Sequence, residues 1–368
     1  MIPVNRPLID STDIDAVTLA LTQTYISGET PPVAEMEAAL SLATGASESI
    51  AVSTGTTAID LIIEALDIKP GDHCIVPNFT IISSVSNLFR KGATVELIDA
   101  DPVTWSMDAN AAAAAMKPST KMVLPVHIYG LPVDMDPILS KANQTGSFVL
   151  EDSAEALGVM YKGKPCGSIG DAAVFSFYAN KIVTGGEGGA ITTSDEGLAK
   201  KLRSLRNLAH SKERFVHERL GWNARISGLS AALISSQLKR LDKLILRKHD
   251  IANLYLEGLK GHPWLTFMPK EMPYSTNAYW VFPILLNSSS PYNAEALQIK
   301  LKSLGVESRR FFCPIHLQPL RADFELVFAS NNSVSENLWR FGLYLPSGLG
   351  NTRQEIEQVI ETLWKISQ

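Results

Sequence analysis

Two stretches, Phe148-Val-Leu-Glu-Asp-Ser-Ala-Glu155 and Phe175-Ser-Phe-Tyr-Ala-Asn-Lys181, decide how this sequence is interpreted. Each begins with a short apolar run that is typical of a buried strand, and each ends in a charged group, Asp152 or Lys181. Side chains at the carboxyl ends of parallel strands meet at one edge of a sheet, where open α/β sheets bind ligands. Each group also has a simpler interpretation, Asp152 as an acid that caps a turn and Lys181 as a surface lysine.

The sequence around these stretches alternates short apolar strands with amphipathic helices through the first two-thirds of the chain. We expect strands at 49–53, 73–77, 94–99, 121–126, 148–152 and 172–177, and helices at 56–66 and 80–89. The strands are apolar on both faces, as expected for a parallel sheet that helices cover on two sides. The pattern therefore predicts an α/β fold with a mostly parallel sheet.

The last third of the chain has a different pattern. It predicts a long helix at 239–260, a strand at 278–286, and helices at 293–304 and 353–368. The final helix opens with a capping box, formed by Thr352 and Glu355. We therefore expect a large domain over residues 1–245 and a smaller α+β domain over residues 246–368.

Composition narrows the class of protein. A net charge of −5 over 368 residues, with a pI near 5.9, argues against a nucleic-acid or anionic-membrane partner. We see no signal peptide and no apolar run of roughly 18 residues, so we expect no membrane insertion. Cys74, Cys166 and Cys313 lie far apart without CxxC spacing, which predicts reduced thiols in a cytoplasmic protein and no metal site.

Two further segments lie between predicted strands and helices. Ser53-Thr-Gly-Thr-Thr57 opens a helix with hydroxyls and free backbone N–H groups, which suits a phosphate or serves only as an N-cap. Ser176 could donate to the same phosphate. Thr184-Gly-Gly-Glu-Gly-Gly189 superficially suggests a dinucleotide fingerprint, but no GxGxxG frame fits between a strand and a helix. A lysine that can attack a carbonyl and an acid that can pair with a pyridinium N–H are what pyridoxal phosphate (PLP) requires.

Taken in order, SxGTTA, EDSAE and FSFYxNKxxxxGEGG resemble the DegT/DnrJ/EryC1/StrS family of PLP-dependent sugar aminotransferases. The resemblance implies a type I aspartate-aminotransferase fold and a homodimer with active sites shared between subunits. It implies that Lys181 carries the cofactor as a Schiff base and that Asp152 pairs with the pyridinium nitrogen. It also implies an amino-acid donor, by family habit glutamate.

The resemblance also assigns roles to other residues. It implies phosphate contacts from Thr56, Thr57, Ser176 and, across the subunit interface, Asn223, and it places Glu155 beside the cofactor's 3-hydroxyl. The candidate substrate contacts are Arg225, Arg309, Arg310 and His316. The family usually has an aromatic residue where this chain has Ile81, so either Ile81 or Phe79 is expected against the cofactor ring. The family's ISGxG segment is Ile26-Ser-Gly-Glu-Thr30 here, so the loop expected near the substrate differs.

The segments around Lys181 and around residues 309–316 look most like perosamine-synthase relatives, which act on a GDP-linked 4-keto-6-deoxymannose. This similarity implies amino transfer to a nucleotide-linked 4-keto-6-deoxyhexose for lipopolysaccharide, O-antigen or another surface polysaccharide. One alternative is a free keto-sugar such as an 8-keto-octulosonate. Another is a non-catalytic regulator or scaffold with the PLP fold. A related sugar dehydratase would carry His in place of Lys181, and a scaffold would be expected to lose Lys181 or Asp152.

Overall fold

An eight-stranded sheet in the order β1-β9-β8-β5-β4-β2-β3-β15 forms the larger part of the computed structural model, which describes residues 1–213, 215–217, 219–329 and 331–368. The strands are β1 (Glu48–Val52), β2 (His73–Pro77), β3 (Thr94–Ile98), β4 (Thr120–Val123), β5 (Phe148–Asp152), β8 (Ala172–Ser176), β9 (Gly189–Thr193) and β15 (Leu326–Phe328). Strand β9 is antiparallel to both of its neighbours, and the other pairings are parallel. The predicted α/β fold with a mostly parallel sheet is confirmed.

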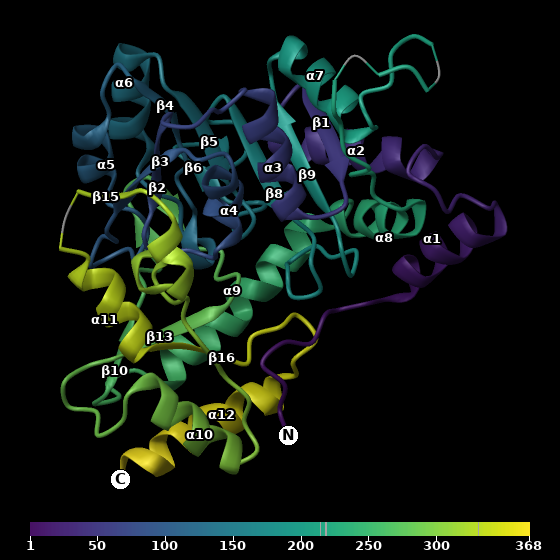
Figure 1. Ribbon diagram of the computed structural model, residues 1–368. Coiled ribbons are helices and arrows are strands. Elements are labelled where there is room, and N and C mark those ends of the chain that lie inside the picture. Colours follow the sequence, from purple (N-terminus) through teal and green to yellow (C-terminus); the bar gives the residue numbers. More distant parts are fainter. Residues whose placement is uncertain (214, 218, 330) are drawn as a thin grey trace.

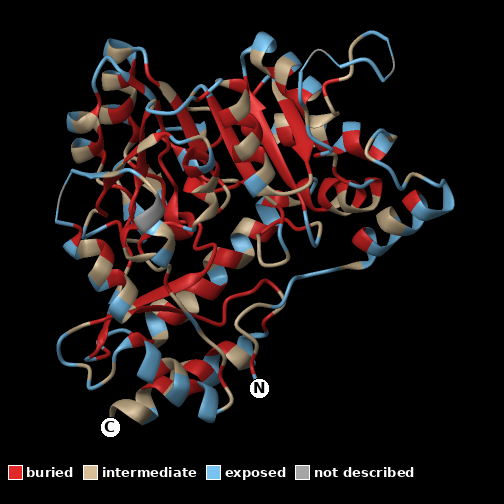
Figure 2. Cartoon of the chain, in the orientation of Figure 1, coloured by how far each residue is buried: buried red, intermediate tan, exposed pale blue. Residues whose placement is uncertain are grey.

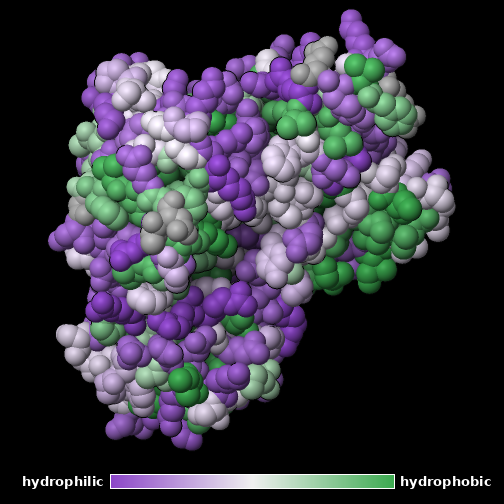
Figure 3. Space-filling view, in the orientation of Figure 1, coloured by the Kyte–Doolittle hydropathy of each residue, from purple (hydrophilic) through white to green (hydrophobic). Residues whose placement is uncertain are grey.

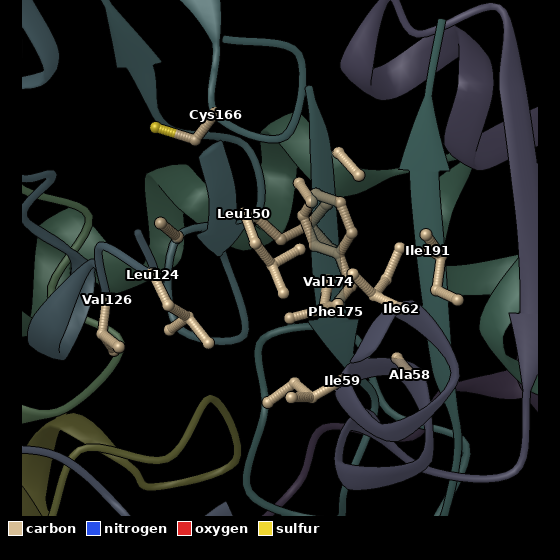
Figure 4. Packing of buried hydrophobic residues seen from close by; sticks show 14 of the residues in the cluster. Ala58, Ile59, Ile62, Leu124, Val126, Leu150, Cys166, Val174, Phe175 and Ile191 are labelled. Atoms are coloured by element: carbon tan, nitrogen blue, oxygen red, sulfur yellow. The ribbon is translucent and has the colours of Figure 1, made fainter. Parts of the chain in front are cut away.

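Both faces of this sheet are covered. Strands β2 and β9 are buried at every residue, and successive side chains of a strand point to opposite faces (Figure 2). Helix α3 (Gly55–Ala65) packs on β8 and β9, with Ala58 and Ile62 directed toward Phe175 and Ile191 (Figure 4). Apolar side chains at helical spacing therefore bury the face that the sequence pattern predicted.

Further helices surround the large sheet (Figure 1). They are α1 (Ser11–Thr22), α2 (Pro31–Thr44), α4 (Ser83–Arg90), α5 (Ala109–Ala115), α6 (Met135–Thr145), α7 (Glu196–Arg206) and α8 (Gly228–Leu238). Helices α1 and α2 both pack on α8, at the side of the sheet where β1 lies. Among the described residues, no helix is long and apolar enough to cross a membrane.

A smaller antiparallel sheet lies below the first in Figure 1. It contains β10 (Leu265–Phe267), β13 (Phe282–Leu286), β16 (Gly342–Leu345) and β14 (Arg309–Arg310), with helices α10 (Ala294–Ser303), α11 (Ser333–Phe341) and α12 (Arg353–Ser367). Helix α9 (Leu241–Gly258) links the two parts, because Leu244 packs in the core of the large part and Tyr255 packs in the core of the small part. The domain boundary expected near residue 245 falls inside this helix and stays a prediction.

Several elements differ from the expected ones. The helix expected at 80–89 begins later, at Ser83, and the strand expected at 278–286 begins at Phe282. The later start of β13 has a local cause, because Tyr279 adopts a left-handed backbone with φ 50° that a strand cannot contain. The capping box of Thr352 and Glu355 is confirmed at the start of α12. The glycine-rich run at 184–189 joins the antiparallel strands β8 and β9 and opens no helix, so it is not a dinucleotide fingerprint.

Candidate active site

A cavity of about 430 Å³ lies at the carboxyl-end edge of the large sheet, facing the smaller sheet. Figure 3 shows the surface hollowed between the two parts of the molecule. The large-sheet wall includes Thr56, Ile81, Asp152, Glu155, Ser176 and Lys181, and the other wall includes Trp280, Arg309, Arg310, Phe312 and Tyr344. Asp152 and Lys181 therefore share one cavity.

Lys181 enters this cavity from the loop that follows β8. Its backbone N–H donates to the Tyr178 carbonyl at 2.9 Å, which closes a tight turn after the strand. Its Nζ lies 3.8 Å from Glu155 Oε1, and its side chain is 12 % exposed. Burial lowers the pKa of Lys181, while the charges of Glu155 and Asp152 oppose that shift. A lysine in this setting loses its proton more readily than a surface lysine and becomes a nucleophile.

Asp152 is the last residue of β5 and is 4 % exposed. The Ala154 N–H donates to Oδ1 at 3.1 Å, and the Ser84 hydroxyl donates to Oδ2 at 3.3 Å. Burial nevertheless raises the pKa of Asp152, because these donors and the charge of Lys181 only partly replace water. A cationic N–H donor in the cavity would satisfy this carboxylate.

Glu155 lies one turn beyond β5 and is 7 % exposed. Its Oε2 accepts a 2.7 Å hydrogen bond from the N–H of Tyr129. Tyr129 has a left-handed backbone conformation, with φ 56°. Burial raises the pKa of Glu155 to about 7, against the opposing effects of the Lys181 charge and the Tyr129 N–H. Glu155 and Lys181 therefore form a charge pair in which the protonation state of each group affects that of the other.

The start of α3 forms a second polar end of the cavity. Thr56 lines it, and the helix N-terminus directs unpaired backbone N–H groups there. A Cβ on Gly55 would lie 3.0 Å from the Ser176 Cβ, and one on Gly189 would lie 2.3 Å from the Thr54 carbonyl carbon. Thr57 does not line the cavity, and its hydroxyl lies 2.9 Å from the Thr54 hydroxyl. This end can bind an anion such as a phosphate.

Besides Thr57, three more of the expected residues do not line the cavity of their own chain. Asn223 is exposed on the segment that follows α7, and Arg225 donates a hydrogen bond to the Asn207 side chain. His316 is buried, with Nδ1 at 2.8 Å from Asn78 Nδ2 and Nε2 at 3.2 Å from Glu336. Within one chain, the structure therefore does not bring these three residues to Lys181.

The two residues expected against the cofactor ring, Ile81 and Phe79, differ in whether they reach the cavity. Ile81 lines the cavity and is 47 % exposed, whereas Phe79 is 1 % exposed and packs among Tyr129, Phe311 and Phe312. Only Ile81 of this pair is positioned to contact a ligand.

Sequence reasoning missed the aromatic residues on the small-domain side of the cavity. Trp280 lies with its ring centroid 3.8 Å from Lys181 Nζ, and Tyr344 lines the cavity beside Arg309. Neither residue belongs to the motifs that identified the site, because all of those motifs lie in the first two-thirds of the chain. The one available signal was Trp280 itself, a large aromatic residue at the start of a predicted strand.

Comparison with known proteins identifies the class of this site. The model of the DegT/DnrJ/EryC1/StrS aminotransferase family matches residues 7–364. The chain belongs to this family. It is 36 % identical over 363 residues to the GDP-perosamine synthase of Caulobacter vibrioides, covering 98 % of this chain and 97 % of that protein. The GDP-perosamine synthase of Escherichia coli O157:H7 is 32 % identical over 364 residues, with the same coverage of 98 % and 97 %.

Solved structures agree with the family assignment. A GDP-4-keto-6-deoxymannose-3-dehydratase with a trapped PLP–glutamate geminal diamine has a TM-score of 0.91 and 25 % identity. The match covers 99 % of this chain and 100 % of the solved one. The aminotransferase described here therefore has the type I PLP fold, and it is a sugar aminotransferase that uses PLP.

The cavity fits this cofactor. Its polar end suits the phosphate, because Thr56 and Ser176 line the cavity there and the start of α3 supplies backbone N–H groups. The lack of a Cβ at Gly55 and Gly189 lets the start of α3 pack closely against β8 and β9. A buried acid, Asp152, and a partly buried lysine, Lys181, line the same space, matching the ring nitrogen and the carbonyl carbon of PLP.

Proposed function

We propose that this aminotransferase moves an amino group from glutamate to a nucleotide-linked 4-keto-6-deoxyhexose for surface-polysaccharide biosynthesis. The observation that carries the chemistry is the cavity shared by Lys181, Asp152 and Glu155. The similarity to two GDP-perosamine synthases supports the sugar. The free thiols Cys74, Cys166 and Cys313 fit a reducing compartment, which we propose is the cytoplasm.

The residues of this chain have distinct roles in the proposal. When bound, PLP supplies an electron sink that lets the proton on the amino-bearing carbon leave. Asp152 would keep the ring nitrogen protonated, and Thr56 and Ser176 would hold the phosphate with the α3 N-terminus. Lys181 attaches the cofactor and, once displaced by the donor amine, carries the proton between the substrate carbon and the cofactor carbon. Glu155 sets the protonation of the Lys181 amine and lies beside the cofactor's 3-hydroxyl.

The cations on the small-domain wall supply the proposed sugar-nucleotide contact. Arg309 is exposed to the cavity, and Arg310 lies 5.4 Å from the Trp339 ring and 3.5 Å from Glu295. Phosphate oxygens bind guanidinium groups strongly in a partly desolvated cavity. These arginines could bind either the pyrophosphate of a nucleotide-linked sugar or the carboxylate of a free sugar. The nucleotide-linked 4-keto-6-deoxyhexose and the free 8-keto-octulosonate are therefore the two substrates to compare.

The test is a substrate panel. The PLP-loaded enzyme, with glutamate as donor, is incubated with GDP-, UDP- and dTDP-linked 4-keto-6-deoxyhexoses and with a free 8-keto-octulosonate, and 2-oxoglutarate release is measured. We expect the GDP-linked sugar to give the highest kcat/KM. Arg309→Met and Arg310→Met should each raise its KM about ten-fold and leave the glutamate half-reaction unchanged. Arg353→Met, at an exposed ion pair on α12, is the matched control. Preference for the free sugar would overturn the nucleotide assignment, and inactivity with every acceptor would favour the scaffold.

We also infer a homodimer with shared sites. Asn223 and Arg225 lie outside their own cavity, as expected for residues that reach the partner's phosphate and substrate. Helix α1 exposes Ile14, Leu19 and Leu21, each more than half accessible. Figure 3 shows an apolar region on the side of the molecule where Figure 1 places α1. Mixing Lys181→Ala chains with Asn223→Ala chains should restore activity, because hybrid dimers contain one intact site. No recovery after demonstrated subunit exchange would contradict the shared site.

A further inference from the structure

The Lys181 amine lies near two different groups, a carboxylate and an aromatic ring. Its Nζ lies 3.8 Å from Glu155 Oε1 and 3.8 Å from the centroid of the Trp280 ring. The first distance is too long for a hydrogen bond, so the carboxylate acts through its charge. The second is a cation–π contact at close range. The ring is thus as near to the reactive nitrogen as the nearest acid.

Trp280 is itself firmly placed. Its indole Nε1–H donates to the Asn180 carbonyl at 2.8 Å, in the residue that precedes Lys181. Its ring stacks on Tyr129 with centroids 6.3 Å apart and planes at 25°, and the residue is 5 % exposed. The backbone beside it is equally constrained, because a Cβ on Gly130 would lie 2.8 Å from the Trp280 nitrogen. The position of the ring is therefore set by the fold rather than by the lysine.

The electrostatic consequence follows from the geometry. An indole face attracts a cation and gains nothing from a neutral amine, so the ring favours the charged form of Lys181. Glu155 and Asp152 act in the same direction, and burial acts against all three. The other charged groups that line the cavity are Arg309, Arg310 and Glu187. Removal of the ring therefore leaves two acids to oppose the desolvation of the amine.

We propose that Trp280 is a positioning residue for Lys181. The anchored indole of Trp280 fixes the position of the lysine amine in the cavity and favours the charged form of that amine. The catalytic meaning of this role rests on the proposed transamination, whereas the contact itself does not. The competing interpretation is that Trp280 only fills the aromatic wall formed by Tyr129 and Tyr344. A wall residue would affect folding but not the protonation of one particular amine.

The test reads that protonation directly. Full-length protein freed of cofactor is labelled with trace isotopic acetic anhydride across pH 6 to 11, and Lys181 acetylation is measured by mass spectrometry against exposed Lys243. Only the neutral amine reacts. Trp280→Leu should shift the Lys181 midpoint to lower pH, so that labelling below the midpoint is about five-fold faster while the high-pH plateau is unchanged. Trp280→Phe, which retains a ring but loses the Asn180 hydrogen bond, should lie between Leu and the wild type.

Controls separate this role from a structural one. Trp264 is a comparably buried tryptophan in the small-domain core, and Trp264→Leu should leave the Lys181 curve unchanged. In the PLP-loaded enzyme, Trp280→Leu should slow a single turnover with glutamate about ten-fold or more, with little change in apparent glutamate affinity. An unchanged Lys181 midpoint in the Trp280 variants would overturn the proposal, and Trp280→Phe decides alone if the Leu variant does not fold. A shifted midpoint in an enzyme that accepts no keto-sugar would overturn the proposed function and leave this contact standing.

Discussion

Lys181 and Lys248 both have amines largely removed from water, and they differ in what surrounds them. Lys181 faces a cavity of about 430 Å³ with two carboxylates and an indole ring. Lys248, on α9, is 2 % exposed, and the hydrogen bond described for its amine goes to the Ser347 carbonyl. Burial lowers the pKa of both amines, that of Lys248 to about 7.

The difference shows that a lowered pKa does not by itself make a lysine catalytic. Lys248 is almost fully shielded from solvent, and the carbonyl that its amine bonds cannot exchange a proton with it. Lys181 lies beside an acid with a pKa of about 7, within reach of a ligand. Perturbed groups become functional where a cavity and a proton partner coincide.

The largest contrast is expected in activity. Lys181→Met should lower turnover by at least about a thousand-fold, because the cofactor attachment and the proton carrier are lost together. Lys248→Met should keep turnover within about two-fold, because that side chain does not reach the cavity. The measurement is kcat for amino transfer at saturating glutamate and keto-sugar. Comparable losses in both variants would mean that the distinction between the two lysines is wrong.

A smaller contrast concerns the acid partner that Lys181 has and Lys248 lacks. Ionised Glu155 favours the ammonium form of Lys181, so Glu155→Gln should lower the pKa of that amine. PLP is captured by the neutral amine, so the acid limb of the capture rate should move to lower pH by about one unit. Rapid mixing with PLP between pH 5.5 and 9, followed by absorbance, measures this shift.

The control for this experiment is Glu187→Gln, an exposed acid that lines the same cavity. Its capture profile should coincide with that of the wild type. A shift toward higher pH in Glu155→Gln, or equal shifts in both variants, would contradict the electrostatic coupling between Glu155 and Lys181.

The smallest contrast lies in stability. The pKa of Lys248 is about 7 in the folded protein and near 10.5 in the unfolded chain. Between these values the unfolded chain binds a proton that the folded chain lacks, so the free energy of unfolding rises with pH. Relative to Lys248→Met, the wild type should gain up to about 1.4 kcal/mol per pH unit across this window. Urea unfolding at pH 7.5 and 9.5 measures the gain, and Lys243→Met, at an exposed position of the same helix, should show none.

Sequence predicted the large-sheet half of the site well, because that half depends on local order along the chain. Asp152 ends a strand predicted at 148–152, and Lys181 follows the next, so both had to meet at one sheet edge. Thr56 and Ser176 follow from the same rule. Ile81 remained one of two candidates until its side chain was seen in the cavity.

The small-domain half could not be predicted in this way. Trp280 meets Lys181 through a hydrogen bond to a residue 100 positions away and a left-handed turn at Tyr279. Strand β15 joins the large sheet from the last third of the chain, and an apolar run of three residues carries no such signal. His316 was expected beside the substrate, yet in this chain it packs between Asn78 and Glu336. Such contacts depend on tertiary packing rather than on spacing.

The central claim is that Lys181, and not Lys248, carries the cofactor. The direct measurement is borohydride reduction of the PLP-loaded enzyme, followed by proteolysis and mass spectrometry of the modified peptide. Reduction makes the lysine–cofactor bond permanent. We predict loss of the visible absorption band and one phosphopyridoxyl group, on Lys181, with none on Lys248. Modification of Lys248, or PLP that washes out of the reduced protein leaving Lys181 unmodified, would contradict the account.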